Sequence, residues 1–379
     1  MTDTTHVPLH ADPAALRALA TSSVELILQL QDASGAYPAS PTFSAYAGYS
    51  WFRDGAFIAD AMSAVGEAES ATKFFDWCSS ILLAREGQIE RINACAAAGN
   101  PVPDGEMLAA RFTFAGGDGT DEWWDFQLDG YGTWLWAVAV HAQRHNLDLR
   151  RWSHGIRLAV DYLLSSWQRP CFDWWEENAA LVHGSTLGCI AAGLAAIADS
   201  GILGDEQAVN VRAAVSEIVA TLTERGLTDG HLAKWLGSSE VDASLVAIIA
   251  PLGVFAASDL IGRRTISAVD TELTVGDGTH RYLADTFFGG GQWPLLSCFL
   301  GLAYTAAGDR ARALALLTWA ASTASSSNAL PEQVGEHLLD RSMTQVWIDR
   351  WGTVAQPLLW SHAMYIRLAV ELEIVEVRA

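Results

Sequence analysis

Basic side chains are scarce in this chain of 379 residues. Lys and Arg number 23 against 44 Asp and Glu, which gives a formal net charge of −21. Binding to phosphate groups depends on clustered Lys and Arg, so nucleic acids and anionic membrane surfaces are poor partners. A neutral ligand rich in hydroxyl groups is compatible with this charge, although an acidic surface can also serve solubility alone.

Cysteine is rare as well, and none of the five cysteines forms a C-x-x-C pair. An odd number of widely separated cysteines argues against a disulfide framework and against a zinc site. The histidines, including His183 and His362, also lack the spacing of metal ligands. We therefore expect no metal site.

Long apolar runs are missing. The longest, Leu245 to Ala257, is too short to span a bilayer and contains Pro251 and Gly253. The first residues, MTDTTHVPLHADPAAL, lack the basic segment and the apolar segment of a secretory signal. These features predict a cytoplasmic protein.

Tryptophan, in contrast, is abundant. Many of the 16 tryptophans stand beside carboxylates and glycines instead of following a helical period. Indole faces stack on the apolar faces of sugar rings while neighbouring polar groups bind the hydroxyls, so this pattern favours a carbohydrate site. Burial in a core is the other explanation.

Apolar residues recur at spacings of three and four along most of the chain, which predicts an all-α fold with almost no strand. No Pro- or Ser-rich linker and no exact repeat divides the chain, so we expect one domain over residues 1–379. About twelve helices are predicted, at 13–32, 54–66, 69–98, 130–147, 150–168, 184–199, 205–226, 240–250, 264–275, 293–307, 309–325 and 355–373.

Long connecting segments rich in Gly, Trp and acidic residues follow about every second helix. They cover 34–53, 100–129, 169–183, 227–239, 277–292 and 326–354. Connections of this length are uncommon unless they are functional. Helix pairs that close into an (α/α)6 barrel would gather these loops around a pocket at one end. An open helical-repeat scaffold is the alternative, but its loops would be shorter and more alike.

Two of these loops carry glutamates suited to acid–base chemistry on a sugar, where one carboxyl group must donate a proton and another must activate water. In the first, Asp173 to Asn178, flanking tryptophans and the adjacent Glu177 are expected to raise the pKa of Glu176. In the second, Pro331 restricts the backbone beside Glu332. Each glutamate alone is also compatible with an ordinary surface turn.

Two aspartates stand at predicted helix starts. Asp54 follows Arg53 in Tyr-Ser-Trp-Phe-Arg-Asp, and Asp129 follows Gln127 in Gln-Leu-Asp-Gly. An N-cap is the commonest role for an aspartate at such a position. An Arg–Asp pair beside Trp is also well suited to binding sugar hydroxyls, because it offers fixed donors and acceptors.

In their order, these segments resemble glycoside hydrolase family 15, the glucoamylase-type family. Its Trp-x-Arg-Asp motif is matched from Trp51 to Asp54, its Gln-x-Asp-Gly motif from Gln127 to Gly130, and its Trp-Glu-Glu motif from Trp175 to Glu177. Further along the chain come the Asp-Ala-Ser-Leu, Arg-Tyr, Glu-Gln and Trp-Ser-His segments that begin at Asp242, Arg281, Glu332 and Trp360. Each motif is weak alone, but seven in order between about residues 45 and 370 are strong.

The resemblance implies an (α/α)6 barrel that removes terminal glucose from an α-glucoside with inversion, releases β-D-glucose and needs no metal or organic cofactor. It implies that Glu176 is the acid and Glu332 the base, and that Arg53 and Asp54 bind the O4 and O6 side of the terminal glucose. The other expected substrate-binding residues are Trp51, Trp123, Gln127, Asp129, Trp175, Glu177, Arg281, Trp293 and Trp360.

Departures from the family narrow the expected substrate. We expect no N-terminal β-sandwich and no carbohydrate-binding module, and the bulky pair Trp174 and Trp175 could narrow the pocket beyond the first sugar. Short α-glucosides, with a preference for the α-1,6 linkage of isomaltose, are therefore predicted. An α-1,4 glucoamylase and a trehalase of the same family remain alternatives.

Three other classes of protein are weighed. A sugar-binding helical scaffold would keep the tryptophans but has no use for an acid and a base. A phosphorylase would need a basic phosphate pocket, and no Gly-rich loop paired with Lys or Arg is visible. A terpene cyclase would need a motif such as DxDD, which the sequence lacks.

Overall fold

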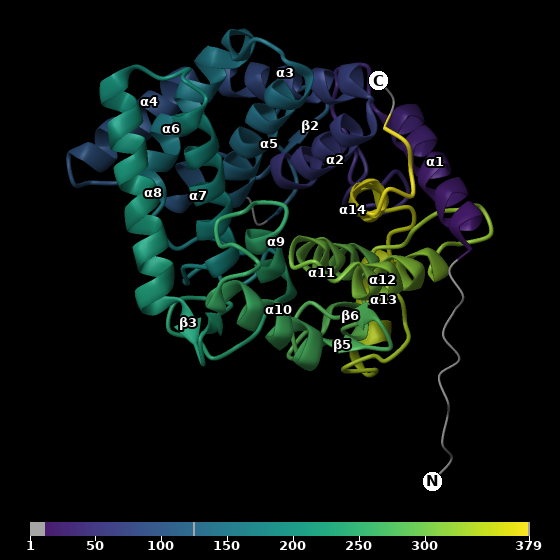
Figure 1. Cartoon of the computed structure of the whole chain (residues 1–379). Coiled ribbons are helices and arrows are strands. Elements are labelled where there is room, and N and C mark those ends of the chain that lie inside the picture. Colours follow the sequence, from purple (N-terminus) through teal and green to yellow (C-terminus); the bar gives the residue numbers. More distant parts are fainter. Residues whose placement is uncertain (1–11, 124–125, 378–379) are drawn as a thin grey trace.

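The computed structural model describes residues 12–123 and 126–377, and in this part the chain is mainly helical (Figure 1). Six helices form an inner ring: α2 (Phe52–Val65), α5 (Asp129–His145), α7 (Gly184–Asp199), α9 (Val246–Ile249), α11 (Pro294–Ala306) and α14 (Leu359–Glu371). Six more pack around them: α1 (Pro13–Leu30), α3 (Ala68–Ala84), α6 (Ser153–Ser166), α8 (Asp205–Arg225), α10 (Leu260–Leu273) and α12 (Arg310–Ser322). Inner and outer helices alternate along the chain, and α14 contacts α2 to close the ring. The prediction of an (α/α)6 barrel is confirmed.

Burial distinguishes the two rings. Every residue of α2 is buried, because this helix has neighbours on all sides. The outer helix α8 instead buries one face, through Ala208, Val211, Ala214, Ile218 and Leu222. Those spacings of three and four residues are the amphipathic pattern from which the outer helices were predicted.

Two glycines allow inner helices α5 and α7 to approach closely. A Cβ atom on Gly193 would lie 2.1 Å from the carbonyl oxygen of Gly132, and one on Gly132 would lie 2.5 Å from that of Cys189. No larger residue fits either position unless the helices move apart.

Two further α-helices and several short elements complete the described chain. These are α4 (Glu86–Ala97) and α13 (Met343–Trp351), the 3-10 helices η1 (Asp104–Glu106), η2 (Leu149–Trp152), η3 (Ala243–Leu245) and η4 (Phe287–Gly289), and the antiparallel strand pairs β1 (Tyr49–Trp51) with β2 (Arg111–Thr113), β3 (Leu227–Thr228) with β4 (His231–Leu232), and β5 (Thr274–Val275) with β6 (Gly278–Thr279).

The single helix predicted at 69–98 is wrong, because the chain breaks at Arg85 into α3 and α4. The Arg85 guanidinium leaves the helix surface to bond the carbonyl oxygen of Gly116 at 3.0 Å and the carboxylate of Asp118 at 2.6 Å. It also lies over the ring of Phe112, 4.5 Å from the centroid. The spacing of apolar residues, from which the helix was predicted, gives no sign of these contacts with a distant loop.

The helix predicted at 240–250 is also much shorter in the structure. The side chain of Asp242 bonds the N–H of Ser244 and starts the 3-10 turn η3, and α9 then makes a single turn. Pro251 follows, and the residue before a proline favours extended backbone, as Ala250 adopts with φ −148° and ψ 130°. The helix predicted at 150–168 begins as η2, and the one predicted at 264–275 starts earlier, at Leu260.

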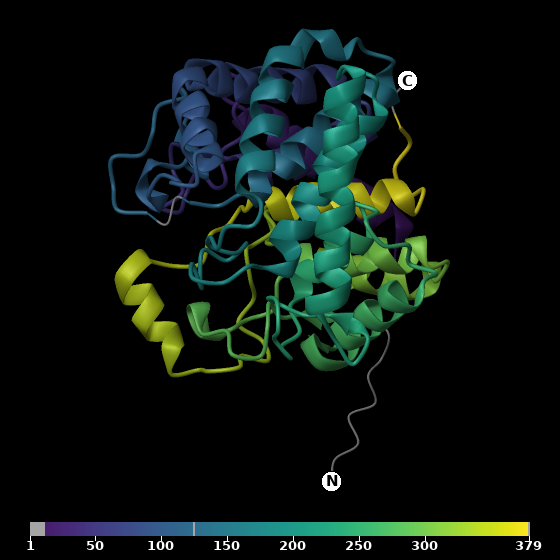
Figure 2. The same cartoon turned by 90° about the vertical axis from the view of Figure 1, so that its left-hand side faces the viewer.

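Helix α13 lies in the segment 326–354 that was predicted to be a loop. None of its residues is buried, and its main contact with another element is with η4. In Figure 2 it is the yellow helix at the lower left, at one end of the molecule. The loops of the described part of 100–129 lie on the same side, so this end is the mouth of the barrel.

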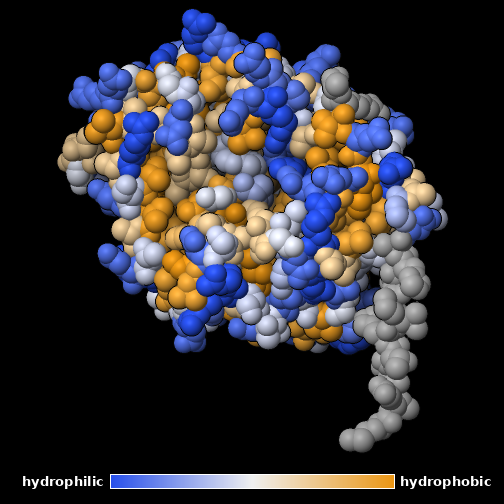
Figure 3. Space-filling view, viewed as in Figure 1, coloured by the Kyte–Doolittle hydropathy of each residue, from blue (hydrophilic) through white to orange (hydrophobic). Residues whose placement is uncertain are grey.

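The opposite end presents a mixed surface. Hydrophilic residues alternate there with small apolar patches (Figure 3). Among the described residues, no helix combines the length and the apolar character needed to cross a bilayer.

Candidate active site

A pocket of about 160 Å³ opens at the mouth of the barrel. It is lined by 11 of the 13 residues predicted for the site: Trp51, Arg53, Asp54, Trp123, Trp175, Glu176, Glu177, Arg281, Trp293, Glu332 and Trp360. Gln127 and Asp129 lie behind this lining. Side chains that are more than 250 residues apart in the sequence therefore converge on one cavity.

The junction between β1 and α2 places Arg53 and Asp54. Trp51 ends the strand and α2 begins at Phe52, so both charged residues lie in the first turn of the helix. The N-cap position is Trp51, which means that Asp54 is not an N-cap. The same holds for Asp129, which follows the N-cap residue Leu128.

The Arg53 guanidinium is fixed by its neighbours. Its Nη1 donates to Gln127 Oε1 at 2.7 Å and to Asp129 Oδ2 at 3.0 Å, and its Nη2 lies 3.3 Å from Asp54 Oδ2. Gln127 and Asp129 therefore orient Arg53 from behind the pocket. Burial raises the pKa of Asp54 although the charge of Arg53 opposes the increase.

A tight turn presents Glu176. Asp173 Oδ1 accepts the backbone N–H groups of Trp175 at 2.9 Å and Glu177 at 3.0 Å, so one carboxylate braces the whole turn. Glu176 has a φ of 63°, a left-handed conformation that a glutamate rarely adopts. Its Oε1 accepts the indole N–H of Trp51 at 2.7 Å.

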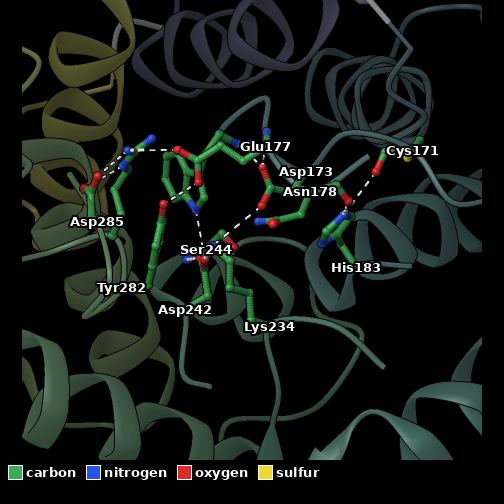
Figure 4. A network of polar contacts seen from close by, with 12 residues as sticks. Cys171, Asp173, Glu177, Asn178, His183, Lys234, Asp242, Ser244, Tyr282 and Asp285 are labelled. Carbon is green, nitrogen blue, oxygen red and sulfur yellow. Dashed lines mark hydrogen bonds and ion pairs between the residues drawn. The ribbon is translucent and has the colours of Figure 1, made fainter. Parts of the chain in front are cut away.

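Burial raises the pKa of Glu176 to about 7, against the opposing charge of Arg53. The raised pKa agrees with the prediction, but Glu177 is not among its causes, and hydrogen bonds from Trp51 and Trp123 lower the pKa of Glu176. The acidic neighbour that adds to the increase is Asp54. Glu177 is turned the other way, where it accepts the hydroxyl of Tyr282 and lies 3.5 Å from Arg281 (Figure 4).

Glu332 approaches the pocket from the segment before α13. Its Oε1 accepts the Tyr46 hydroxyl at 2.9 Å, whereas its buried Oε2 has no hydrogen-bond partner among the described residues. Burial raises the pKa of Glu332 to about 8, with Tyr46 and Arg281 opposing and the charges of Asp54 and Glu176 adding to the increase.

Helix α14 fixes the backbone around Glu332. The N–H of Leu330 donates to His362 Nε2 at 2.9 Å, and the hydroxyl of Ser361 donates to the carbonyl oxygen of Pro331 at 2.8 Å. Burial lowers the pKa of His362 to about 3, so the ring is neutral and its other nitrogen donates to Ser23 at 2.8 Å. His362 is thus a structural residue. In the described chain, no group of three or more His, Cys, Asp or Glu could hold a metal ion.

Aromatic rings form the walls and the floor of the pocket. Trp174 is buried against Phe57 and Trp360, so it belongs to the floor and does not narrow the mouth. Trp175 packs on Trp293 with ring centroids 5.7 Å apart.

Besides Trp174, five aromatic lining residues are outside the 13 predicted for the site: Phe43, Tyr46, Phe287, Trp347 and Trp351. Phe43 and Tyr46 lie in a loop that was predicted to be functional. The spacing of Trp347 and Trp351, four residues apart, is the pattern of one helix face and could have indicated α13.

Residues 13–287 match the family described as glycosyl hydrolases family 15. The chain belongs to this family. It is 51% identical over 362 residues to the isomaltose glucohydrolase of Kribbella flavida. The aligned region covers 95% of this chain and 94% of that protein. The resemblance recognised in the sequence is confirmed, and the chain is a glycoside hydrolase. A sugar-binding scaffold without activity is therefore not its class.

Solved structures agree. A wild-type glycosidase, 49% identical to this chain, superposes with a TM-score of 0.93 over 96% of this chain and 98% of its own, and a variant of that glycosidase in complex with glucose matches equally well. The glucoamylase of Saccharomycopsis fibuligera, 14% identical, shares the fold with a TM-score of 0.73 over 100% of this chain and 99% of its own.

Proposed function

We propose that this family 15 enzyme is an inverting exo-α-glucosidase that releases β-D-glucose from the non-reducing end of short α-glucosides, with a preference for isomaltose-type α-1,6 linkages. The observation that carries the proposal is that two glutamates from separate loops, the half-buried Glu176 and the buried Glu332, line the same pocket. The name of the Kribbella flavida relative supports the linkage.

Arg53 and Asp54 bind the terminal glucose. Both are more than nine-tenths buried, and Gln127 and Asp129 already orient the guanidinium, so little side-chain freedom is lost when a sugar binds. Trp51 and Trp360 supply apolar surface beside them. A site fixed in this way at the bottom of a pocket accepts a chain end and not the middle of a chain.

Glu176 donates the proton to the glycosidic oxygen. Burial favours its protonated form, and the glycosidic oxygen can only accept a hydrogen bond, which favours that form further. Trp51 holds one oxygen of this carboxyl group at 2.7 Å.

Glu332 activates the water that attacks C1. A base must be ionised, and burial opposes ionisation here. A water that donates to the unpartnered Oε2 stabilises the carboxylate, as the Tyr46 hydroxyl already does at Oε1. The mechanism needs one proton on Glu176 and none on Glu332, and the hydrogen bonds of the glycosidic oxygen and of the attacking water favour this distribution.

Arg281, Glu177 and the aromatic residues of the mouth contact the second sugar. Glu177 lies 3.5 Å from Arg281, and both line the pocket together with Phe287 and Trp351. Trp347 packs on Phe287 with ring centroids 5.0 Å apart, which closes this side of the mouth. Little room is left for a third sugar, and longer chains gain few contacts.

The test is glucose release from isomaltose, maltose, trehalose and a longer dextrin at equal concentrations. We expect the highest kcat/KM on isomaltose, and proton NMR should detect the β-anomer of glucose first. Maltose as the best substrate would overturn the linkage alone, and a specificity constant highest on soluble starch would overturn the short-substrate proposal. The α-anomer as the first product would contradict inversion, which needs about 6.5–9.5 Å between the two carboxyl groups.

A further inference from the structure

A buried lysine lies behind the turn that carries Glu176. Lys234 follows β4, and its side chain is 2% exposed and outside the pocket lining. Its ammonium group lies 2.6 Å from Asp242 Oδ2, 3.6 Å from Asp173 Oδ2 and 3.4 Å from the centroid of the Tyr282 ring. Figure 4 shows Lys234, Asp242 and Tyr282 below Glu177 in this view, with Asp173 beside Glu177.

The two aspartates beside Lys234 hold different parts of the turn. Asp173 accepts the backbone N–H groups of Trp175 and Glu177. Asp242 accepts the indole N–H of Trp175 at 2.9 Å, and its other oxygen accepts the N–H and the hydroxyl of Ser244. The backbone and the large side chain of the turn therefore depend on two buried carboxylates.

Lys234 supplies the charge that these carboxylates need. Asp173 and Asp242 are each 2% exposed. In the ranges 12–123 and 126–377, Lys234 is the only cation within ion-pair distance of either. A buried carboxylate that loses its ion partner is strongly destabilised and either takes up a proton or moves towards water.

The backbone of Glu176 makes this support necessary. Its positive φ is unfavourable for a glutamate and persists only where surrounding contacts fix it. If Asp173 moved, Trp175 and Glu177 would lose their backbone bonds, and the residue between them would relax to an ordinary conformation. Its carboxyl group would then point elsewhere.

We propose that Lys234 is a positioning residue that keeps the 173–177 turn, and with it the proton of Glu176, directed at the glycosidic oxygen by neutralising Asp173 and Asp242. This inference rests on the proposed function, in which Glu176 is the acid. Lys234 touches no substrate. Arg53 and Asp54 reach the terminal glucose from α2, so binding of that sugar does not depend on Lys234.

The test compares two leaving groups in the variant Lys234→Met. Isomaltose needs a proton on its leaving oxygen. In α-D-glucopyranosyl fluoride the C1–F bond breaks with its electron pair going to fluoride, while water adds its oxygen to C1 and gives up a proton to Glu332. The departing fluoride needs no proton from Glu176.

We expect kcat of Lys234→Met on isomaltose to fall about 10²-fold, the lower end of what a general acid supplies. On the fluoride, kcat should stay close to the wild-type value because its leaving group needs no general acid, and the inhibition constant for glucose should stay unchanged. The matched control is Lys73→Met, which removes an exposed lysine paired with Glu69 on the outer helix α3. This variant should keep the wild-type kcat on both substrates. Equal decreases in kcat on both substrates would overturn the proposal, because an enzyme that is only less stable loses activity on both to the same extent.

A double variant guards against failure to fold. In Lys234→Met with Asp173→Asn one buried charge of each sign is removed, and the amide oxygen still accepts the two N–H groups of the turn. We expect the melting temperature and the ratio of the two activities to return part of the way to wild type, because Asp173 no longer carries an uncompensated charge whereas Asp242 still does. Recovery of stability without recovery of the ratio would overturn the proposal, and so would failure of both variants to fold.

The failure of the proposed function looks different. If Glu176 is not the acid, the variant Glu176→Gln loses activity on both substrates to the same extent. If the enzyme is not an exo-α-glucosidase, the wild-type protein hydrolyses neither substrate.

Discussion

Asp54→Asn separates binding of the sugar from stability of the fold. The carboxylate is buried beside Arg53 in the first turn of α2, and it is not the N-cap of that helix. If Asp54 binds two hydroxyls of the terminal glucose, the variant replaces two hydrogen bonds to a charged group by weaker ones. Each replacement costs about 1.5–2 kcal/mol, the lower part of the range for such bonds, because the amide keeps one acceptor oxygen. The sum of about 3–4 kcal/mol corresponds to a decrease in kcat/KM of roughly 10²–10³-fold.

The effect on stability has the opposite sign. Burial raises the pKa of Asp54 above its unfolded value, so the ionised carboxylate works against the fold at pH values above its folded pKa. Arg53 keeps Asp129 and Gln127 as partners in the variant. We therefore expect the melting temperature at neutral pH to stay level or to rise, and the difference to shrink as the pH falls and Asp54 of the wild type takes up a proton.

The charge of Asp54 also raises the pKa of Glu176 and of Glu332, in each case in addition to burial. In the variant, the alkaline limb of kcat/KM should therefore shift to lower pH. The assays are glucose release from isomaltose across the pH range and thermal unfolding, with Asp199→Asn, an exposed aspartate at the end of α7, as the matched control. A melting temperature several degrees lower together with near-wild-type kcat/KM would refute the reasoning, because that is the result expected for an N-cap.

Three further outcomes are expected. Glu176→Gln and Glu332→Gln should each lower kcat on isomaltose by about 10²–10⁴-fold with unchanged circular dichroism, and near-wild-type turnover in either variant would contradict its role. The kcat/KM of the wild type should decline above about pH 7, because the acid loses its proton as the pH rises through the raised pKa of Glu176; a rate that stays level to pH 9 would contradict this assignment. Trp351→Ala should increase kcat/KM on isomaltotriose relative to isomaltose by widening the mouth, and an unchanged ratio would place the size limit elsewhere.

The barrel could be predicted because most helices carry their own signal. Outer helices such as α8 have one apolar face, and inner helices such as α2 and α11 are apolar enough to be recognised from end to end. The errors arose where a distant contact overrides the local pattern. At Arg85, where the predicted helix divides into α3 and α4, the side chain bonds Gly116 and Asp118, which lie about 30 residues away and outside any local window.

The site could be predicted through its motifs, but the division of roles within it could not. Sequence placed Arg53, Gln127 and Asp129 together as substrate-binding residues, whereas the structure puts the last two behind the first. Glu177 stands beside Glu176 in the chain, yet its side chain turns towards Tyr282. Side-chain direction depends on the φ of Glu176 and on partners from later loops, and neither can be deduced from spacing.

Closure of the ring between α14 and α2 has a consequence for how activity arises during folding. The Tyr46 hydroxyl reaches Glu332 across 286 residues of sequence, and Ser23 reaches His362 across 339. Contacts between such distant residues form late, since the entropy of closing the loop must be overcome before the contact contributes anything. The helices can form and pair locally before that event, but the surroundings of Glu332 exist only when the two ends of the barrel have met. During refolding from denaturant, helical ellipticity should therefore return ahead of glucose release.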